Sequence, residues 1–502
     1  MPRKQSHGNG YRLIIRYLGI TSILVGVALL LPLLLLPVYP QEAEYAKCFL
    51  LPGITSVIAG YLVYELLKEE AWGRLKKNQA AMIVTLSWAL AILVSAVPFM
   101  MTGNYNFTQS VFECTSGYST TGLSVVNVEE APHLFLMFRS IMLFVGGVGL
   151  VLVVMSVITD YYGMRLFEAE GHDQMAPNLV KSARVIISIY SGYIIGGTIL
   201  YMVFGMNWFD ALNHSIAAVS TGGFSTKASS IGYYQNLGIE IVTIVLMLLG
   251  GTGFLVHLAL VKGEFKKVVS HSEFRFQLVV YPAAIAAAAV LMLRQFALSV
   301  PESIRNAVFQ AVSAMTTTGF QTVDSFRTFS PALMLLMTLL MLIGGGAGST
   351  AGGIKQYRVY LVVKEMFWTL QDRLSPDRVI RPRTVNRCGD KVILKEEEKS
   401  AVSNYFVLYM FLFMIGTFIF CCYGYSIQDS MFEFSSAIST VGLSAGITGY
   451  DAPAGVLWTA TAGMFIGRLE VYIVLITVLK MMIDTGKKVQ GWRRGIRNRF
   501  LK

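Results

Sequence analysis

Long apolar stretches separated by short polar segments dominate the pattern along this chain. Ten stretches reach the length of about 20 mostly apolar residues that an α-helix needs to cross a bilayer. They lie at roughly 13–38, 47–67, 79–101, 133–159, 183–206, 237–261, 277–299, 331–363, 401–424 and 454–483. The first stretch is too long, and too soon followed by a second, to be a cleavable signal peptide. The pattern therefore predicts an all-α polytopic membrane protein with ten transmembrane helices.

Four of the intervals between these stretches are unusual for loops. Each is about thirty residues long, partly apolar and rich in Ser, Thr and Gly. They are too short to be domains and too apolar for ordinary loops. The intervals lie at 102–132, 207–236, 300–330 and 425–453. We expect them to re-enter the membrane, where irregular backbone is tolerated only if it lines protein or a water-filled cavity.

The four intervals contain an internal repeat that aligns without insertion. The repeats read TQSVFECTSGYSTTGLS (108–124), FDALNHSIAAVSTGGFS (209–225), RNAVFQAVSAMTTTGFQ (305–321) and QDSMFEFSSAISTVGLS (428–444). Each contains Ser/Thr-Thr-x-Gly, which we call the STxG segment. One such tetrapeptide is an ordinary turn, but four in register indicate a repeated unit of span, short re-entrant helix, STxG segment and span. The four units are pseudo-symmetric, and two extra spans precede them.

Four such units can place their STxG segments around one axis, so that backbone carbonyls form rings that replace the water shell of an ion. Glycine is needed because successive carbonyls face one axis only if a residue takes φ > 0 or a similar conformation. The segments hold no carboxylate, so we expect a selectivity filter for a monovalent cation. The candidate ion-binding residues are Thr120, Thr121, Gly122, Thr221, Gly222, Gly223, Thr317, Thr318, Gly319, Thr440, Val441 and Gly442.

Two further positions recur in the repeats. A polar residue lies thirteen places before each glycine, where a short helix would need an N-cap. The cap candidates are Gln109, Asp210, Asn306 and Asp429. His214 stands where the other repeats have Glu113, Gln310 and Glu433, and we expect a packing or hydrogen-bonding position there rather than a proton relay.

The repeats divide the chain into consecutive parts. We expect a two-span N-terminal domain (1–78), repeat 1 (79–160), repeat 2 (161–262) and repeat 3 with a broken second span (263–370). A basic loop (371–400), repeat 4 (401–485) and a basic tail (486–502) follow.

The second span of repeat 3 is interrupted by GGGAGSTAGGIK at 344–355. Gly344 lies about 20 Å deep at 1.5 Å per residue, and each glycine costs a helix about 1 kcal/mol relative to alanine. We interpret the segment as a flexible gate below the filter. The alternative is a close-packed glycine seam like the weaker GGVG at 146–149 and GGTG at 250–253. The gate candidates are Gly344, Gly345, Gly346, Gly348, Gly352, Gly353 and Lys355.

Arg468 lies well inside the last span, and an arginine within the membrane indicates a functional site. Its neighbour Glu470 is two residues away, and side chains at that spacing do not face each other on a helix. We therefore expect Arg468 to face the pore beside the glycine segment, as an electrostatic barrier to cations. Lys355 would either act similarly or extend toward the cytoplasm.

Charge is scarce and asymmetric. The chain is 54% hydrophobic and only 14% charged, which excludes a cytosolic enzyme or a disordered protein, although its net charge is +11. Six segments that fall on the same side of the predicted membrane, both termini among them, hold 32 of the 41 Lys and Arg residues, so both termini are expected in the cytoplasm. This scatter over several loops argues against nucleic acid, leaving anionic lipid headgroups or a protein partner for the basic loops. The five cysteines form neither a zinc pattern nor a disulfide framework.

The fourfold pattern with one filter glycine per repeat resembles the superfamily of potassium transporters that includes TrkH, KtrB and their plant and fungal relatives. GGGAGSTAGGIK (344–355), GRLEVYIVL (467–475) and the two extra spans make the bacterial TrkH family the nearest resemblance. Gly222 and Val441 depart from the threonine of repeats 1 and 3 and limit the fourfold symmetry. The resemblance implies potassium uptake across a bacterial inner membrane, with potassium as the permeant ligand and no organic cofactor. It also implies a homodimer and a cytoplasmic nucleotide-binding regulatory subunit of TrkA type.

Two other classes of function were weighed against a channel-like pore. A secondary transporter coupling potassium to protons or sodium usually has a chain of acids or histidines within the membrane, and here Glu470 is the main candidate. A membrane enzyme would need clustered His, Asp, Glu or Ser, whereas the six histidines are scattered. We therefore predict a transporter and not an enzyme.

Overall fold

The computed structural model describes residues 8–67, 77–150, 179–296, 299–375 and 382–500. This part of the chain is mostly helical. Six of its helices are long and apolar enough to cross a membrane: Tyr11–Leu35, Pro40–Leu66, Asn78–Met101, Arg184–Val203, Ser272–Phe296 and Glu396–Cys422. Two bent helix pairs and two shorter apolar helices accompany them. These elements coincide with the apolar stretches of the sequence.

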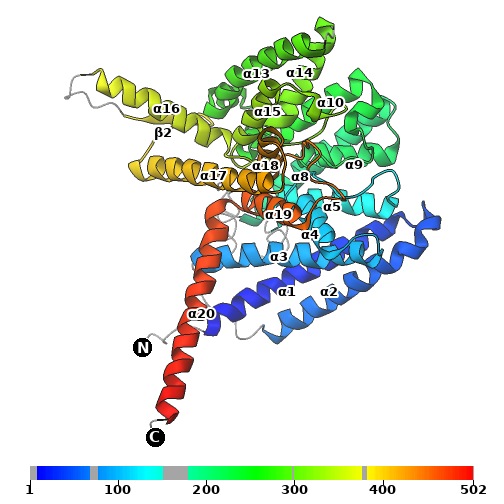
Figure 1. Ribbon diagram of the computed structural model, residues 1–502, viewed down its shortest axis with the longest axis vertical. Helices are drawn as coiled ribbons and strands as arrows, with labels where there is room; N and C mark the ends of the chain where they lie inside the picture. The colour runs from blue at the N-terminus through cyan, green and yellow to red at the C-terminus, as the bar shows by residue number, and fades with distance from the viewer. Residues whose placement is uncertain (1–7, 68–76, 151–178, 297–298, 376–381, 501–502) are drawn as a thin grey trace.

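The N-terminal elements form a closely packed pair. They are α1 (Gly8–Leu30), η1 (Leu31–Leu35), η2 (Pro40–Tyr45) and α2 (Ala46–Leu66). The hydroxyls of Ser22 and Ser56 each donate to the other residue's carbonyl over 2.8 Å, and a side chain on Gly26 would meet the backbone of Gly53. Small residues thus let the two backbones approach closely. In Figure 1 the pair lies with α3 along one side of the molecule.

The other helices follow the predicted order of span, short helix and span four times. Repeat 1 contains α3 (Lys77–Met101), α4 (Phe107–Tyr118) and α5 (His133–Val148). Repeat 2 contains α8 (Leu179–Val203), α9 (Trp208–Val219), η3 (Ser230–Tyr234), α10 (Leu237–Gly250) and α11 (Phe254–Val261). After α12 (Phe265–Ser270), repeat 3 contains α13 (Ser272–Phe296), α14 (Val300–Met315), η4 (Phe326–Thr328), α15 (Pro331–Ile343) and α16 (Gln356–Arg373). Repeat 4 contains α17 (Glu396–Cys422), α18 (Ile427–Ile438), α19 (Ala454–Arg468) and α20 (Val471–Phe500).

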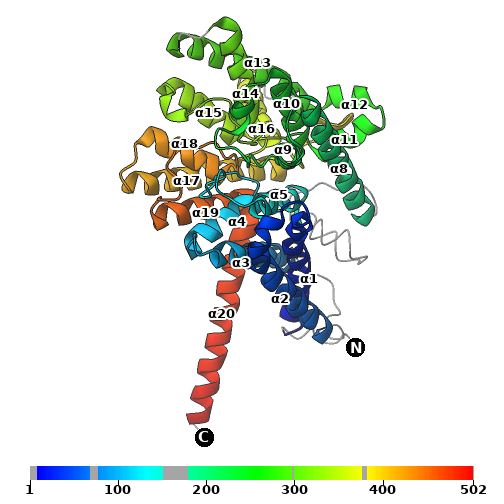
Figure 2. The same cartoon turned by 90° about the vertical axis from the view of Figure 1, so that its right-hand side faces the viewer.

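The second spans are not the continuous helices that hydropathy predicts. The stretch 237–261 consists of α10 and α11, and the chain bends by 108° between them. The stretch 454–483 is divided between α19 and α20, with a bend of 106°. In repeat 1, α5 ends at Val148, and the rest of the predicted span 133–159 beyond residue 150 lies outside the described residues. Only the break in repeat 3 was predicted. The C-terminal part of α20 stands clear of the other helices (Figures 1 and 2).

The basic loop between α16 and α17 contains a β-hairpin, which an all-α prediction omits. Strands β1 (Thr384–Arg387) and β2 (Asp390–Ile393) are antiparallel, with Val385 paired to Val392. Residues 376–381 of this loop lie outside the described part of the chain. We call the side of the molecule on which the hairpin lies, and toward which α16 projects, the hairpin side (Figure 1).

Candidate functional site: four STxG segments and a glycine loop

Each STxG segment follows a short helix whose start is fixed by a side-chain cap. Asn106, Asn207, Ser299 and Ser426 each accept a hydrogen bond from the backbone N–H three residues later. The cap positions predicted from the repeat are therefore wrong by three residues or more. Gln109, Asp210 and Asp429 occupy the third helical position, whereas Asn306 lies inside α14, which begins four residues earlier relative to its glycine. The Ser299–Glu302 capping box produces that earlier start.

The C-terminal end of each short helix has the same backbone geometry. The residue x of each segment donates its N–H to the carbonyl five residues before it, as from Thr121 to Ser116 over 2.8 Å, and the threonine donates to the carbonyl three residues before. This pattern is a Schellman motif, which places one residue in the left-handed conformation. That residue is a threonine in all four repeats, with φ of 55°, 51°, 54° and 52° for Thr120, Thr221, Thr317 and Thr440. A β-branched residue is strained there, at a cost on the order of 1–3 kcal/mol.

The glycines also take positive φ and bring the four segments together in a closed ring. The values are 96°, 60°, 85° and 100° for Gly122, Gly223, Gly319 and Gly442. An added Cβ would come closer than 3.0 Å to a carbonyl oxygen of the next repeat in every case. The oxygens met are those of Gly222, Thr318, Val441 and Thr121, in that order. Repeat 1 thus meets repeat 2, repeat 2 meets repeat 3, repeat 3 meets repeat 4, and repeat 4 returns to repeat 1.

The four segments carry only uncharged oxygen atoms. The backbone N–H groups of the segments are turned back to their helices, which leaves the carbonyls available, and helix C-termini carry partial negative charge. Within the described residues, the buried hydroxyls of Thr120 and Thr440 have no hydrogen-bond partner. The described residues also contain no group of three or more His, Cys, Asp or Glu side chains arranged to hold a metal. Carbonyl and hydroxyl oxygens without carboxylates suit a monovalent cation better than a divalent one.

One residue per short helix holds the chain that follows each glycine. Glu113 accepts from the Ser124 hydroxyl at 3.0 Å, and Glu433 accepts from Ser444 at 2.8 Å. Gln310 donates to Thr322 over 3.2 Å. His214 contacts the Asp210 carbonyl with Nδ1 at 2.8 Å and the Ser225 hydroxyl with Nε2 at 2.9 Å. These contacts agree with the hydrogen-bonding interpretation of the position.

Charged braces between neighbouring repeats were not singled out by sequence reasoning. Arg139 donates to Glu113 over 2.8 Å within repeat 1 and reaches Phe224 of repeat 2, with its guanidinium 3.9 Å from the ring centroid. Arg305 of repeat 3 binds Glu240 of repeat 2 through two bonds of 2.6 Å. The signal for them was present, because they are among the few cations on the side of the spans that carries little positive charge.

Between repeats 3 and 4, an arginine side chain binds backbone carbonyls. Arg327 donates from Nε to the Ala445 carbonyl over 2.5 Å and from a terminal nitrogen to the Gly446 carbonyl over 3.1 Å. Between repeats 4 and 1 the contact is uncharged, since Gln109 donates to the Tyr450 carbonyl over 2.8 Å. Neighbouring repeats are therefore tied together all the way around the ring.

The glycine loop, Gly344–Lys355, packs directly against the threonines of the STxG segments. Gly352 donates its N–H to the Thr317 hydroxyl over 2.7 Å, and Thr221 donates its hydroxyl to that of Thr350 over 3.1 Å. A Cβ on Gly352 would overlap the Thr440 hydroxyl. The loop thus contacts the threonines of three repeats.

The breaks in the other second spans hold this loop. At the α10–α11 break, the Gly251 carbonyl accepts from Gly346 over 2.9 Å and the Phe254 N–H donates to Gly348 over 3.0 Å. The GGTG motif (250–253) is therefore closely packed, and it packs against the glycine loop.

Arg468 is the last residue of α19, and its guanidinium donates to the backbone carbonyl of Thr350 in the loop. It also donates to two backbone carbonyls of α5, those of Gly146 and, over 3.3 Å, Gly147. The structure thus places Arg468 beside the loop, as predicted, and shows that it bonds the loop backbone. Glu470, which the sequence argued was not a partner of Arg468, binds Arg358 at 2.5 Å. Glu470 has φ of 61° at the break before α20.

Lys355 closes the loop at its other end. Its ammonium group donates to the Ala351 carbonyl within the loop. A small cavity of about 30 Å³ beside it is lined by the glycine loop, Arg468 and Glu470. Gly344, Gly345, Gly346, Gly348, Gly352 and Gly353 all belong to this loop, so the structure brings every predicted gate residue together with Arg468.

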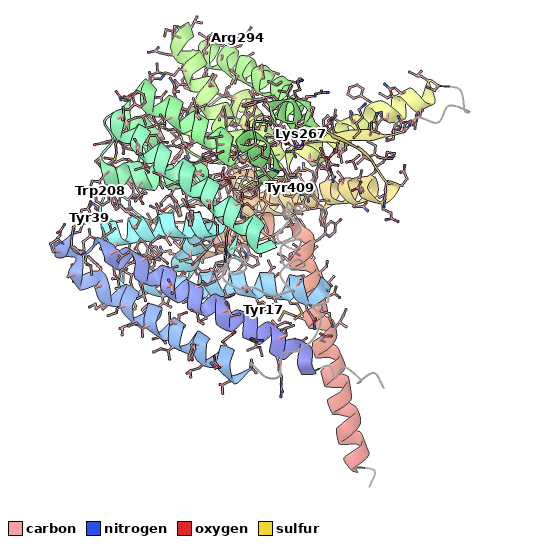
Figure 3. The ribbon with its side chains drawn as sticks, turned by 180° about the vertical axis from the view of Figure 1, so that it is seen from behind. Tyr17, Tyr39, Trp208, Lys267, Arg294 and Tyr409 are labelled. Carbon is pink, nitrogen blue, oxygen red and sulfur yellow. The ribbon has the colours of Figure 1, made fainter. Side chains whose placement is uncertain are left out.

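Tyr409 of α17 supports the fourth segment from behind. Its hydroxyl donates to the Ile438 carbonyl over 3.0 Å and lies 2.9 Å from the Ser439 hydroxyl. Figure 3 shows Tyr409 near the middle of the molecule, surrounded by helices.

Comparison with known proteins identifies relatives of this chain. A family model described as "TrkH: Cation transport protein" matches residues 52–487. The Trk system potassium uptake protein TrkH of Halomonas elongata is 28% identical over 479 residues, and the alignment covers 93% of this chain and 98% of that protein. The TrkH of Escherichia coli K12 is 29% identical over 484 residues, with the same coverage.

A solved structure gives the same result for the fold. The crystal structure of the potassium transporter TrkH from Vibrio parahaemolyticus superposes with a TM-score of 0.82 at 25% identity, covering 93% of this chain and 98% of that one. The resemblance found in the sequence is confirmed, and the protein is a multi-pass membrane transporter and not an enzyme. Its fourfold STxG pattern, its helical fold and its match over residues 52–487 together assign the chain to the TrkH family of cation transport proteins.

Proposed function

We propose that this protein takes up potassium through a channel-like pore whose narrowest part is the ring of STxG segments. The observation that carries the proposal is the cyclic order in which each glycine of the ring meets a carbonyl oxygen of the next repeat. Such a ring offers backbone oxygens to a dehydrated monovalent cation. Potassium as the permeant ligand is taken from the relatives, which are named potassium uptake proteins. No organic cofactor is required for this function.

The pore is proposed to be only moderately selective. Each repeat contributes one glycine at this position, where a potassium channel's TVGYG has two, so fewer ordered oxygen rings are expected. Gly222 and Val441 also remove the threonine hydroxyl that Thr121 and Thr318 supply at the matching place. We expect sodium to permeate more slowly than potassium without being excluded.

The glycine loop is the proposed gate. It lies against three of the four threonines and is held by hydrogen bonds from backbone groups and from side chains such as those of Thr317 and Arg468. Each neutral bond contributes about 1 kcal/mol net, so the loop can move aside by exchanging such bonds one at a time. Arg468 is proposed to limit ion passage in two ways. Its positive charge below the ring repels cations, and its hydrogen bonds hold the loop in place.

Coupled transport receives less support from the buried carboxylates. Within the described residues, Glu113 is paired with Arg139, Glu470 is paired with Arg358, and Glu433 accepts bonds from Ala445 and Thr448. A proton or sodium pathway needs groups that exchange their partners during transport. The membrane potential is therefore proposed to drive uptake.

The hairpin side is proposed to face the cytoplasm of a bacterial cell, with the protein in the inner membrane. The distribution of Lys and Arg supports this orientation and ten spans with both termini inside. A homodimer and a nucleotide-binding regulatory subunit of TrkA type are proposed from the family resemblance. The basic loops would contact that subunit or anionic lipid headgroups, and no nucleic-acid partner is expected.

Flux through purified protein in liposomes tests the function. Potassium and sodium gradients are imposed separately at a clamped membrane voltage, and the flux of each ion is measured. We expect potassium flux that follows the voltage, with a smaller sodium flux. Potassium flux that requires a proton or sodium gradient would favour the coupled transporter, and equal rates for both ions would remove the selectivity assigned to the ring.

A further inference from the structure

The glycine loop is also held from the hairpin side, by a carboxylate that sequence reasoning did not single out. Glu273, the second residue of α13, is buried with 4% of its surface exposed. Its Oε1 accepts the Ala347 N–H over 2.9 Å, and a Cβ on Gly346 would lie 3.0 Å from its Oε2. A hydrogen bond from an amide to a carboxylate is stronger than one between neutral groups. Glu273 therefore provides a charged anchor for a loop whose other bonds come mostly from neutral backbone groups.

His271 connects this anchor to the hairpin. Its Nε2 lies 3.4 Å from Oε2 of Glu273, and its Nδ1 accepts the N–H of Cys388 over 3.2 Å. A ring that accepts at Nδ1 carries its proton on Nε2, where it faces the carboxylate. The Asn386 N–H donates to the neighbouring Ser272 hydroxyl over 3.0 Å. The hairpin turn, His271, Glu273 and Ala347 thus form one continuous chain of contacts.

The hairpin rests on the elements at both ends of this chain. On α16, which directly follows the loop, Arg387 donates to the Tyr357 hydroxyl over 2.6 Å, and Val385 is buried in the same cluster as Leu361. On α12, the hairpin turn packs against Lys267, which Figure 3 shows on the side from which α16 projects. A displacement of the hairpin would therefore act on the loop from two directions.

We propose that Glu273 is a positioning residue that keeps the glycine loop against the STxG segments, and that the β1–β2 hairpin controls it through His271. This inference rests on the proposed role of the loop as the gate. The tip of the hairpin at 389–391 is exposed, so it is accessible to whatever binds on the hairpin side. Pulling the hairpin away removes His271 from Glu273 and weakens the bond to Ala347.

Two measurements on the full-length protein in liposomes test this inference. Potassium flux at clamped voltage is compared among wild type, Glu273→Ala, Glu273→Gln and His271→Ala. The control is Glu396→Ala, which removes an exposed carboxylate at the start of α17 that pairs with Lys399 at 2.5 Å. We expect a several-fold increase for Glu273→Ala and a smaller one for Glu273→Gln, whose amide oxygen still accepts from Ala347, with no change for the control. His271→Ala should raise flux alone and add nothing to Glu273→Ala.

Hydrogen–deuterium exchange of the same samples reports the loop directly. Peptides covering 344–355 should exchange faster in Glu273→Ala and His271→Ala, while those covering 435–445 should not change. Wild-type flux with unchanged exchange in both variants would overturn the inference and leave the pore assignment intact. If the wild type itself does not conduct, the proposed function fails, and exchange alone still decides whether Glu273 holds the loop. If Glu273→Ala does not fold, His271→Ala and Glu273→Gln still decide the outcome by the same measurements.

Discussion

The backbone N–H of Gly352 donates to the side-chain hydroxyl of Thr317 over 2.7 Å. This bond joins the glycine loop to a threonine that is itself in the left-handed conformation, with φ of 54°. Because the hydroxyl accepts a bond from the loop, its oxygen is partly occupied while the loop is in place. The position of the loop and the state of the ring are therefore linked through these two residues.

Gly352→Ala should open the pore. A Cβ at this position would overlap the Thr440 hydroxyl and the Ser439 carbonyl, so the loop would have to move away from the ring. We expect potassium flux in liposomes to rise several-fold. Gly449→Ala is the matched control, because Gly449, like Gly352, is outside the positive-φ region and a Cβ there would meet nothing within 4 Å. Equal flux in the two variants would show that the overlap at Gly352 does not control conduction.

Shortening the loop tests the same role without a clash. Deleting about half of Gly344–Gly353 should leave the protein folded, since these glycines bury few side-chain atoms, and should raise flux in the absence of any partner. Flux and melting temperature are measured on the same preparation. A folded deletion variant that conducts no faster than wild type would show that the segment is a packing seam.

Alanine at a glycine of the ring should reduce the preference for potassium. At Gly319, for example, a Cβ would collide with the Val441 carbonyl and the backbone of Gly442, which would tilt the oxygens that face the ion. We expect the potassium-to-sodium flux ratio to fall several-fold in Gly122→Ala, Gly223→Ala, Gly319→Ala and Gly442→Ala. Gly103→Ala is the control, because Gly103 has φ of 77° with open space around it. An unchanged ratio in all four ring variants would exclude the ring as the filter.

Arg468 can be tested for its two proposed roles separately. Arg468→Lys keeps the positive charge but loses the planar fork that reaches both Thr350 and Gly146. A hydrogen bond to a charged group is worth about 1.5–3 kcal/mol, and about 1.4 kcal/mol corresponds to a tenfold change in rate. If Arg468 acts mainly by holding the loop through hydrogen bonds, flux should rise about tenfold in both Arg468→Lys and Arg468→Gln.

The two variants would differ if the charge dominates. In that case Arg468→Gln should conduct faster and Arg468→Lys should resemble wild type. Melting temperatures of the same samples show whether the changes act through stability. Lower stability in both variants without any gain in flux would assign Arg468 a structural role only.

The buried pair of Arg139 and Glu113 should be important for stability. Their side chains are 2% and 1% exposed, and removing one partner of a buried pair costs about 3–5 kcal/mol because the other charge is left without compensation. We expect Arg139→Met to lower the melting temperature strongly and Arg139→Met with Glu113→Gln to recover much of the loss. A double variant no more stable than Arg139→Met would show that the uncompensated charge is not the cause.

Much of the site could be predicted because it is repeated in the sequence. The four Thr-x-Gly segments align by residue type alone, and their glycines were assigned positive φ from the need to turn carbonyls toward one axis. The caps could also have been found, since Asn106 with Gln109 and Ser299 with Glu302 are local capping-box patterns. They were missed because the alignment was anchored on the glycines, while α14 is longer than the other short helices.

The breaks in repeats 2 and 4 could not be predicted in the same way. Hydropathy measures whether residues suit the membrane, and an apolar helix that bends at Gly250–Gly253 or at Glu470 keeps the same composition as a straight one. Each bend coincides with contacts between remote segments: the glycine loop bonds the backbone of Gly251 and Phe254 at the first, and Arg358 binds the Glu470 carboxylate at the second. These partners are more than 90 residues apart along the chain.

The membrane class, the repeated unit and the candidate residues around the axis could be predicted from the residues alone, because hydrophobicity, helix length and residue spacing are local properties. Which atoms meet is a property of the folded chain. The order of the ring, the left-handed threonines, the bond from Arg468 to Thr350 and the chain from Cys388 through His271 and Glu273 to Ala347 depend on distances between remote segments. Such distances are set by packing of the whole fold, since backbone amides and carbonyls that no helix satisfies must find partners wherever the folded chain brings them.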